Sequence, residues 1–155
     1  MLKKILSITI LCMILTTHGF AAEKIDFSYR GIELGESYEE MVNKIGQPRM
    51  DISHLTDTAV VTYYIYGENN DTRIGIHEAT KKVVDIRISD KTYESEKGVK
   101  IGATLYKLNK AYGKGEKERI GGKVYYIYQQ NEKERLMLDI SQGYLNEIRI
   151  TTLEQ

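Results

Sequence analysis

The sequence predicts an α+β protein: two tandem repeats, each a helix followed by an antiparallel meander, forming one curved antiparallel sheet with the helices on one face. The first observation behind this prediction is an internal duplication. The segment Gly31–Gly35 recurs 67 residues later as Gly98–Gly102, and the four residues Tyr63–Tyr66 recur unchanged 62 residues later as Tyr125–Tyr128. The order of the matching segments is the same in both copies, so the duplication defines repeat 1, residues 23–90, and repeat 2, residues 91–155. We expect the two repeats to form a single globular domain.

The second observation is a short amphipathic helix at the start of each repeat. Tyr38, Met41, Val42 and Ile45 follow the spacing of one helical face. Ser37 with Glu40 predicts a capping box at the start, and Gly46 with Pro48 ends the helix. In repeat 2, Thr104 is the expected cap and Gly113 the expected stop. Helices this short need a surface to pack on.

The third observation is alternation of apolar and polar residues after each helix. It predicts three strands per repeat, at about 58–66, 72–78 and 82–88, and at about 122–129, 134–140 and 144–150. The links between them are short and rich in Gly, Asn and charged residues, so consecutive strands must run antiparallel. Residues 89–97 are polar and form the expected connector.

The N-terminal 22 residues are typical of a signal peptide. Lys3 and Lys4 precede an apolar stretch that is too short to span a bilayer, and small residues follow it. We expect a mature N terminus at Ala22 or Glu23. The only Cys, Cys12, follows the bulky Leu11, whereas a lipid-attachment motif requires a small residue there. The expected product is therefore secreted or periplasmic, not lipid-anchored, with no membrane span after signal removal.

The charge balance bears on the class of partner. The chain of 155 residues has 22 basic and 22 acidic side chains. Loss of residues 1–22 leaves 20 basic side chains and a net charge of −2. This balance argues against a nucleic-acid partner, for which a basic excess is typical. We expect the partner to be another exported or envelope protein.

The segment Gly31–Gly35, together with Ser37, Met41, Val42 and Gly46-Gln47-Pro48, resembles the opening of repeats in the β-lactamase-inhibitor-protein-like fold. The SmpA/OmlA outer-membrane assembly lipoproteins are similar over one such unit. The resemblance implies a tandem helix-plus-meander, one curved antiparallel sheet and a protein-binding surface. The inhibitors carry disulfides and the assembly proteins a lipidated Cys, and the mature chain has neither. The resemblance therefore implies the fold and not those specific functions.

Strand alternation separates two faces of the sheet. We expect one face to meet the helices through aliphatic side chains: Ile74, Ile76, Val84, Ile86, Ile88, Leu136, Leu138, Ile140, Ile148 and Ile150, joined by Tyr63, Ile65, Tyr125 and Ile127. The other face is expected to expose Tyr and Arg, the side chains most frequent at binding hot spots. The protein-binding residues predicted there are Tyr64, Tyr66, Arg73, Arg87, Tyr126, Tyr128, Arg135, Met137 and Arg149, with Asp85 and Glu147 beside them.

The predicted function is non-enzymatic protein binding through this Tyr/Arg face. Two alternatives stay open: the face is only a solvated sheet surface, or a cleft between the repeats holds a small ligand, a peptide or a glycan. Residues 50–57 are an expected loop, and Ser53, His54 and Asp57 within it lie too close in sequence to converge as a catalytic triad. The acidic segment Glu68–Asp71 lacks calcium-loop spacing. We therefore expect no catalytic residues, no metal and no cofactor.

Overall fold

The structure, a computed structural model, describes residues 28–55 and 59–153. The predicted signal peptide and Asp57 lie outside the described residues. The two helices are α1 (Tyr38–Ile45) and α2 (Leu105–Tyr112). The strands are β1 (Ser28–Tyr29), β2 (Ile32–Glu33), β3 (Met50–Leu55), β4 (Val60–Tyr66), β5 (Thr72–His77), β6 (Lys82–Ile88), β7 (Glu116–Ile120), β8 (Lys123–Gln129), β9 (Arg135–Ser141) and β10 (Tyr144–Thr151).

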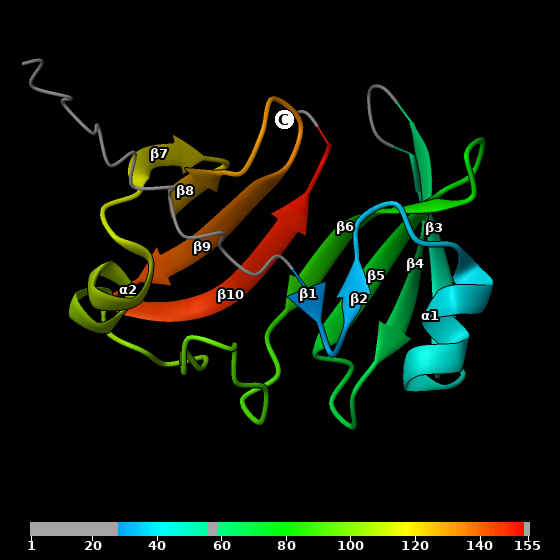
Figure 1. Ribbon diagram of the computed structural model, residues 1–155, viewed down its shortest axis with the longest axis horizontal. Helices are drawn as coiled ribbons and strands as arrows, with labels where there is room; N and C mark the ends of the chain where they lie inside the picture. Colours follow the sequence, from blue (N-terminus) through cyan, green and yellow to red (C-terminus); the bar gives the residue numbers. More distant parts are fainter. Residues whose placement is uncertain (1–27, 56–58, 154–155) are drawn as a thin grey trace, which may run out of the picture.

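The main sheet has eight strands in the order β3-β4-β5-β6-β10-β9-β8-β7, and all its pairings are antiparallel. The predicted α+β class with an antiparallel sheet is confirmed. Each helix precedes four strands, and the last strands of the two sets, β6 and β10, pair at the middle of the sheet (Figure 1). β1 and β2 form a separate two-stranded sheet.

The sequence prediction missed two of the eight strands, β3 and β7, which are the two edges of the sheet. All six residues of β3 are exposed, and β7 is exposed at four of its five positions. Neither strand therefore needs the alternation of apolar and polar residues that marks a half-buried strand. Residues 50–57 were expected to be a loop, and that expectation is wrong for residues 50–55.

The helix caps follow the sequence closely. The Ser37 side chain accepts a hydrogen bond from the Glu40 backbone, and the Glu40 side chain accepts one in return from the Ser37 backbone, which completes the predicted capping box. In α2, Thr104 caps the Lys107 backbone N–H. Each helix ends at a glycine with positive φ, Gly46 or Gly113.

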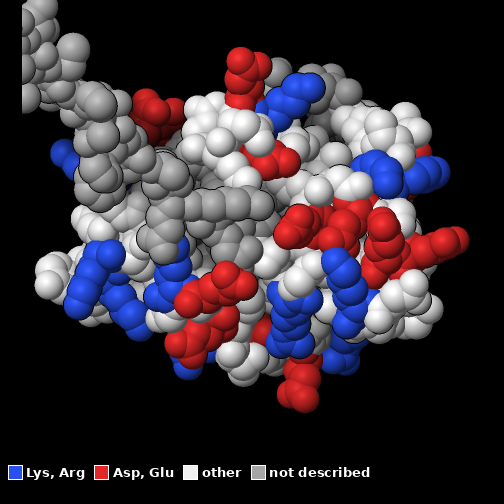
Figure 2. Space-filling model, viewed as in Figure 1, with Lys and Arg blue, Asp and Glu red and all other residues white. Residues whose placement is uncertain are grey.

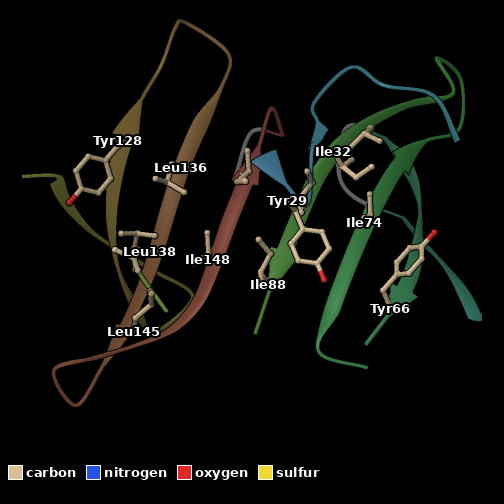
Figure 3. Packing of buried hydrophobic residues seen from close by; sticks show 14 of the residues in the cluster. Tyr29, Ile32, Tyr66, Ile74, Ile88, Tyr128, Leu136, Leu138, Leu145 and Ile148 are labelled. Atoms are coloured by element: carbon tan, nitrogen blue, oxygen red, sulfur yellow. The ribbon is translucent and has the colours of Figure 1, made fainter. Parts of the chain in front are cut away.

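The core draws on both halves of the sheet. Met41 of α1 and Leu108 of α2 are fully buried in one cluster with Ile86 of β6 and Ile150 of β10. We call this cluster the main core. Figure 3 shows side chains from both halves gathered in it, with Tyr66 near one end and Tyr128 near the other. Nine of the ten aliphatic residues predicted for this face belong to it: Ile74, Ile76, Ile86, Ile88, Leu136, Leu138, Ile140, Ile148 and Ile150.

The tenth predicted core residue, Val84, is a correction. β6 carries a bulge, because Ile76 pairs with Val83 whereas the preceding Gly75 pairs with Asp85. The bulge shifts the alternation by one residue, so Val83 enters the main core and Val84 packs with Val61 and Tyr63 on the other side.

The tyrosines of β4 and β8 are the larger correction. Tyr66 and Tyr128 were expected to be exposed opposite the helices, but both are buried in the main core, and Tyr64 and Tyr126 are half-buried against it. The residues expected in the core instead, Tyr63, Ile65, Tyr125 and Ile127, form small clusters on the other face. The cause is the register: Tyr64 pairs with Ile74 and Tyr126 with Leu138, and directly paired residues share a face.

Tyr66 and Tyr128, the two tyrosines buried in the main core, make equivalent hydrogen bonds to the ends of the two helices. The Tyr66 hydroxyl donates to the Gly46 carbonyl at 3.1 Å, and the Tyr128 hydroxyl donates to the Gly113 carbonyl at 3.0 Å. Each tyrosine thus satisfies a carbonyl oxygen at the C-terminal end of a helix. Burial also raises the pKa of Tyr66 to about 12.

We expect Tyr66→Phe and Tyr128→Phe each to lower the free energy of unfolding by about 0.5–1.5 kcal/mol, because each removes one buried hydrogen bond and keeps the ring. Chemical denaturation measures the effect. Tyr106→Phe, on a side chain that is 78% exposed, is the control and should change nothing. If Tyr66→Phe and Tyr128→Phe are both as stable as Tyr106→Phe, the hydrogen bonds of these tyrosines to the helix ends do not stabilise the fold.

Candidate binding face

The face opposite the main core carries a row of paired side chains across the sheet. Along this row Arg73, Arg87 and Arg149 are consecutive partners on β5, β6 and β10. Ile65 of β4 continues the row on one side, and Met137 of β9 with Ile127 of β8 continues it on the other. We call this side of the sheet the Arg face. The charge of two of these guanidinium groups, those of Arg87 and Arg149, is offset by a buried anion.

That anion is Asp85, which is fully buried. Its carboxylate accepts a hydrogen bond from Arg149 Nε at 2.7 Å on one oxygen, and from Arg87 Nε at 2.7 Å on the other. The Tyr63 hydroxyl donates to the second oxygen at 2.7 Å. The Arg87 guanidinium lies over the Tyr63 ring, 5.2 Å from its centre. Because Asp85 and Arg149 lie on the paired strands β6 and β10, this ion pair joins the two halves of the sheet.

The arginines around Asp85 keep its carboxyl group ionised. Burial alone acts to raise the pKa of Asp85, but the guanidinium groups of Arg149 and Arg87 outweigh it and hold this pKa below its ordinary value. Burial, followed by the Asp85 charge, raises the pKa of Tyr63 to about 12, so its hydroxyl remains a proton donor. The carboxylate of Asp85 is therefore fully used by its neighbours and is not free to act on a ligand.

Arg73 is the exception among the three arginines. It is exposed, and within residues 28–55 and 59–153 no hydrogen bond or ion pair to its guanidinium is found. Arg73 and Arg87 line a hollow of about 150 Å³, which we call the Arg hollow. The other walls are Ile52, His54, Tyr63 and Ile65. An unpaired guanidinium at an apolar wall is a site for a carboxylate or another anion, because both hydrogen bonding and charge favour it.

The structure divides the nine predicted binding residues between the two faces. Arg73, Arg87, Arg149 and Met137 lie in one row of the Arg face, as their spacing predicted, and Arg135 lies on the same face. Two of them are covered: Met137 is 0% and Arg149 8% exposed. Arg135 donates to the Leu153 carbonyl. The four tyrosines, Tyr64, Tyr66, Tyr126 and Tyr128, belong to the main-core side, so they are not part of the Arg face.

Sequence reasoning missed the edge-strand contribution to the Arg hollow. Ile52 and His54 were assigned to a loop, yet they are two of its six lining residues. A signal was present: residues 50, 52 and 54 are Met, Ile and His, a short apolar alternation next to a strand. Tyr63 and Ile65 were expected in the core. They line the hollow because the two faces of β4 are the reverse of those expected.

The sequence-adjacent Ser53 and His54 do not form a catalytic pair. They are neighbours on β3, so their side chains project to opposite faces of the sheet. Ser53 Oγ instead lies 3.2 Å from Thr62 Oγ1. No group of three or more His, Cys, Asp or Glu side chains that could hold a metal ion occurs in the part of the chain that the structure describes.

Outside the Arg face, the surface of the molecule carries charges of both signs. In Figure 2, which has the view of Figure 1, Lys and Arg side chains are interspersed with Asp and Glu over the described residues. A larger hollow of about 660 Å³ lies between the β4–β5 turn and the segment after β6. The residues that line it are polar or charged apart from one glycine: Arg30, Gly67, Glu68, Asn69, Asp71, Ser89, Asp90, Lys91 and Thr92.

Comparison with solved structures identifies the fold. An extracellular protein containing a SCP domain from Bacillus anthracis matches with a TM-score of 0.56 and 14% identity, over 76% of this chain and 43% of that one. A DUF4309 family protein from Bacillus subtilis matches with a TM-score of 0.51 and 13% identity, over 80% and 84% of the two chains. The chain thus spans less than half of the first protein. Both are similar to this chain in fold.

A candidate beta-lactamase inhibitor protein from Streptococcus mutans also matches over 84% of this chain and 91% of its own, with 16% identity, but with a TM-score of only 0.34. That score is too low to establish a shared fold. No protein-family model matches the sequence, and no curated protein matches it. Within the described residues, no helix has the length and apolar character needed to cross a membrane.

Proposed function

We propose that the chain is an exported, non-enzymatic protein-binding module that holds an acidic side chain or a C-terminal carboxylate of its partner at the Arg hollow. The observation that carries the proposal is Arg73, an exposed guanidinium without a partner among the described residues, set against apolar walls. Arg87 supplies a second cation, fixed in place by Asp85 and Tyr63.

The size of the hollow supports a protein partner over a small molecule. At about 150 Å³ it is smaller than the pockets of about 300–1,000 Å³ that enclose small-molecule ligands. It has room for a single side chain. The exposed β3 residues Met50 and Ile52 continue this surface to the sheet edge, so a partner that places one acidic side chain in the hollow also covers apolar area.

Export is part of the same proposal. The charged and then apolar pattern of residues 1–22 supports a signal peptide, and the Bacillus anthracis protein of similar fold is described as extracellular. We propose that the mature protein is secreted or periplasmic and carries no lipid anchor.

We infer further that the chain is a duplicated helix-plus-meander unit, residues 23–90 and 91–155, with both helices on one face of a curved sheet. The matching order of elements supports this inference. So do features that recur at the offsets of the sequence repeat: Tyr66 and Tyr128 anchor equivalent glycines, and the bulges of β6 and β10 fall at equivalent positions.

A second candidate function is the binding of a glycan or another small polar ligand. The site would be the larger hollow, between the β4–β5 turn and the segment after β6. Its volume of about 660 Å³ lies in the range of small-molecule pockets, and side chains such as Asn69 and Asp90 offer hydrogen bonds. The hollow is lined by residues of repeat 1 and by Lys91 and Thr92 of the connector, with no residue from the second helix or its strands, and so differs from the expected cleft between repeats.

Affinity capture tests the proposed function. The mature protein is immobilised and exposed to the envelope extract and culture medium of its own host, and retained proteins are quantified by mass spectrometry. We expect Arg73→Glu to lower retention of the partner at least tenfold, because a carboxylate in the hollow then meets a like charge. Arg73 is exposed, so the variant should keep the thermal stability of the parent.

Lys114→Glu is the matched control, since it makes the same charge change at an exposed position in the segment that joins α2 to β7. It should retain the partner as the parent does. Equal retention by the Arg73→Glu column of every protein that the parent captures would contradict binding at the Arg hollow.

A further inference from the structure

The two edges of the eight-stranded sheet differ in chemistry. β7 presents Glu116, Lys117, Glu118 and Arg119, and charged residues of this kind prevent a sheet edge from pairing with another chain. β3 at the other edge has only one acidic residue, Asp51, and one His. The sheet is therefore protected at one edge and open at the other.

The open edge is also apolar. Six large hydrophobic side chains are exposed among the described residues, and four of them lie on β3 or on its partner strand: Met50 at 48%, Ile52 at 55%, Leu55 at 75% and Val60 at 43%. Because β3 pairs only with β4, the backbone groups on its outer side have no strand partner within the sheet. An exposed apolar edge strand of six residues is a template for a further strand.

We propose that β3 pairs with β3 of a second copy of this chain, so that two sheets join edge to edge as a symmetric dimer. This inference is independent of what binds at the Arg hollow. A two-fold axis through Ile52 and normal to the sheet keeps both Arg faces on the same side. It places Ile52 opposite Ile52, Met50 opposite His54 and Asp51 opposite Ser53. No like charges meet in this register, and apolar side chains meet at its centre.

The chemistry of the edges also limits the assembly to two copies. Pairing of β3 with β7 would set Met50 and Ile52 against charged side chains, and would leave a free edge on every copy for open-ended growth. Pairing of β3 with β3 uses both open edges and leaves only the charged β7 edges outside. The Arg hollow begins at Ile52 and His54, so the dimer brings two Arg hollows to the same seam.

A contact of six residues on each copy is small beside the interfaces of permanent dimers, so we expect dissociation in the micromolar range. Sedimentation velocity of the chain without residues 1–22, over a concentration series, should show a monomer–dimer equilibrium. Ile52→Lys sets two like charges opposite each other at the axis and should raise the dissociation constant at least tenfold. Tyr106→Lys makes the same kind of change on α2, at another exposed apolar residue, and should leave the equilibrium unchanged.

Cross-linking tests the register separately. Removal of residues 1–22 removes the only Cys, so Ile52→Cys introduces a single thiol. Directly opposed residues have Cβ atoms about 4.5–5.5 Å apart, close to the spacing of a disulfide, so mild oxidation should give a covalent dimer. Tyr106→Cys should not. A protein that stays monomeric at every concentration, or a dimer that Ile52→Lys leaves intact, would overturn the proposal. In the monomeric case a strand of another protein becomes the occupant of the edge.

Discussion

Replacement of Asp85 with alanine is expected to lower the free energy of unfolding by about 3–5 kcal/mol. The variant leaves Arg149, which is 8% exposed, and Arg87 without their shared anion, and it removes the acceptor of the Tyr63 hydroxyl. A buried charge without its partner costs far more than a lost surface ion pair. Equilibrium denaturation in urea at neutral pH measures the difference.

Glu94→Ala provides the control for Asp85→Ala. Glu94 pairs with Lys100 at 2.9 Å, but both side chains are about half exposed, and such pairs contribute at most about 1 kcal/mol. A loss of stability in Asp85→Ala no greater than in this control would show that the central cluster does not hold the two halves together.

The same carboxylate predicts an acid dependence. The pKa of Asp85 in the folded state lies below its ordinary value of 3.8, so its contribution to stability is present above that value and is lost as pH falls through the folded pKa. Asp85→Asn resembles the protonated group and lacks this titration. Its stability should therefore fall less than that of the parent between neutral pH and pH values below about 4.

The second large effect concerns the core. Ile86→Ala and Ile148→Ala should each destabilise the protein by about 2–5 kcal/mol, since both side chains are buried in the main core on the paired strands β6 and β10. Because one cluster includes both halves, each variant should unfold in a single transition, measured with two optical probes.

Tyr106→Ala tests whether burial is the cause. The residue is 78% exposed on α2, and its truncation should change stability by less than about 1 kcal/mol. Two separate transitions in any of these proteins would indicate that the halves fold independently, against the single core.

The sequence predicts the helices, their caps and the aliphatic side of the inner strands, because each follows from a pattern of residues that are close in sequence. Ser37 with Glu40 and the isoleucines of β6 are examples. The face of β4 is a different matter. Tyr63, Tyr64, Ile65 and Tyr66 are all apolar enough for either side, so alternation alone cannot choose between them.

The register of the β4–β5 hairpin determines which of these residues face the main core. Tyr66 pairs with Thr72 across the turn, and the pairing then places Tyr64 with Ile74. This register depends on the residues at which the turn between β4 and β5 begins and ends, and a change of one residue there would invert the face.

Two other features had a weak local signal or none. The bulge that moves Val84 out of the main core depends on how β5 and β6 meet, which neither strand encodes alone. The Arg hollow depends on an edge strand whose six residues are all exposed, so its only local signal is the short alternation of Met50, Ile52 and His54. Arg73, Arg87 and Arg149 were nevertheless assigned to one face correctly, since their neighbours in sequence are buried isoleucines.

The position of β10 at the middle of the sheet has a consequence for the order of folding during synthesis. β6 and β9 both depend on residues 144–151 for one of their two partners. Until those residues have emerged, the chain presents two unpaired strand edges, flanked by isoleucines such as Ile86 and Ile88 that have no complete core to enter. The buried charge cluster is likewise incomplete, because Asp85 lacks Arg149. The two halves therefore close as a unit only after residues 144–151 are available, and the eight-stranded sheet cannot be completed until then.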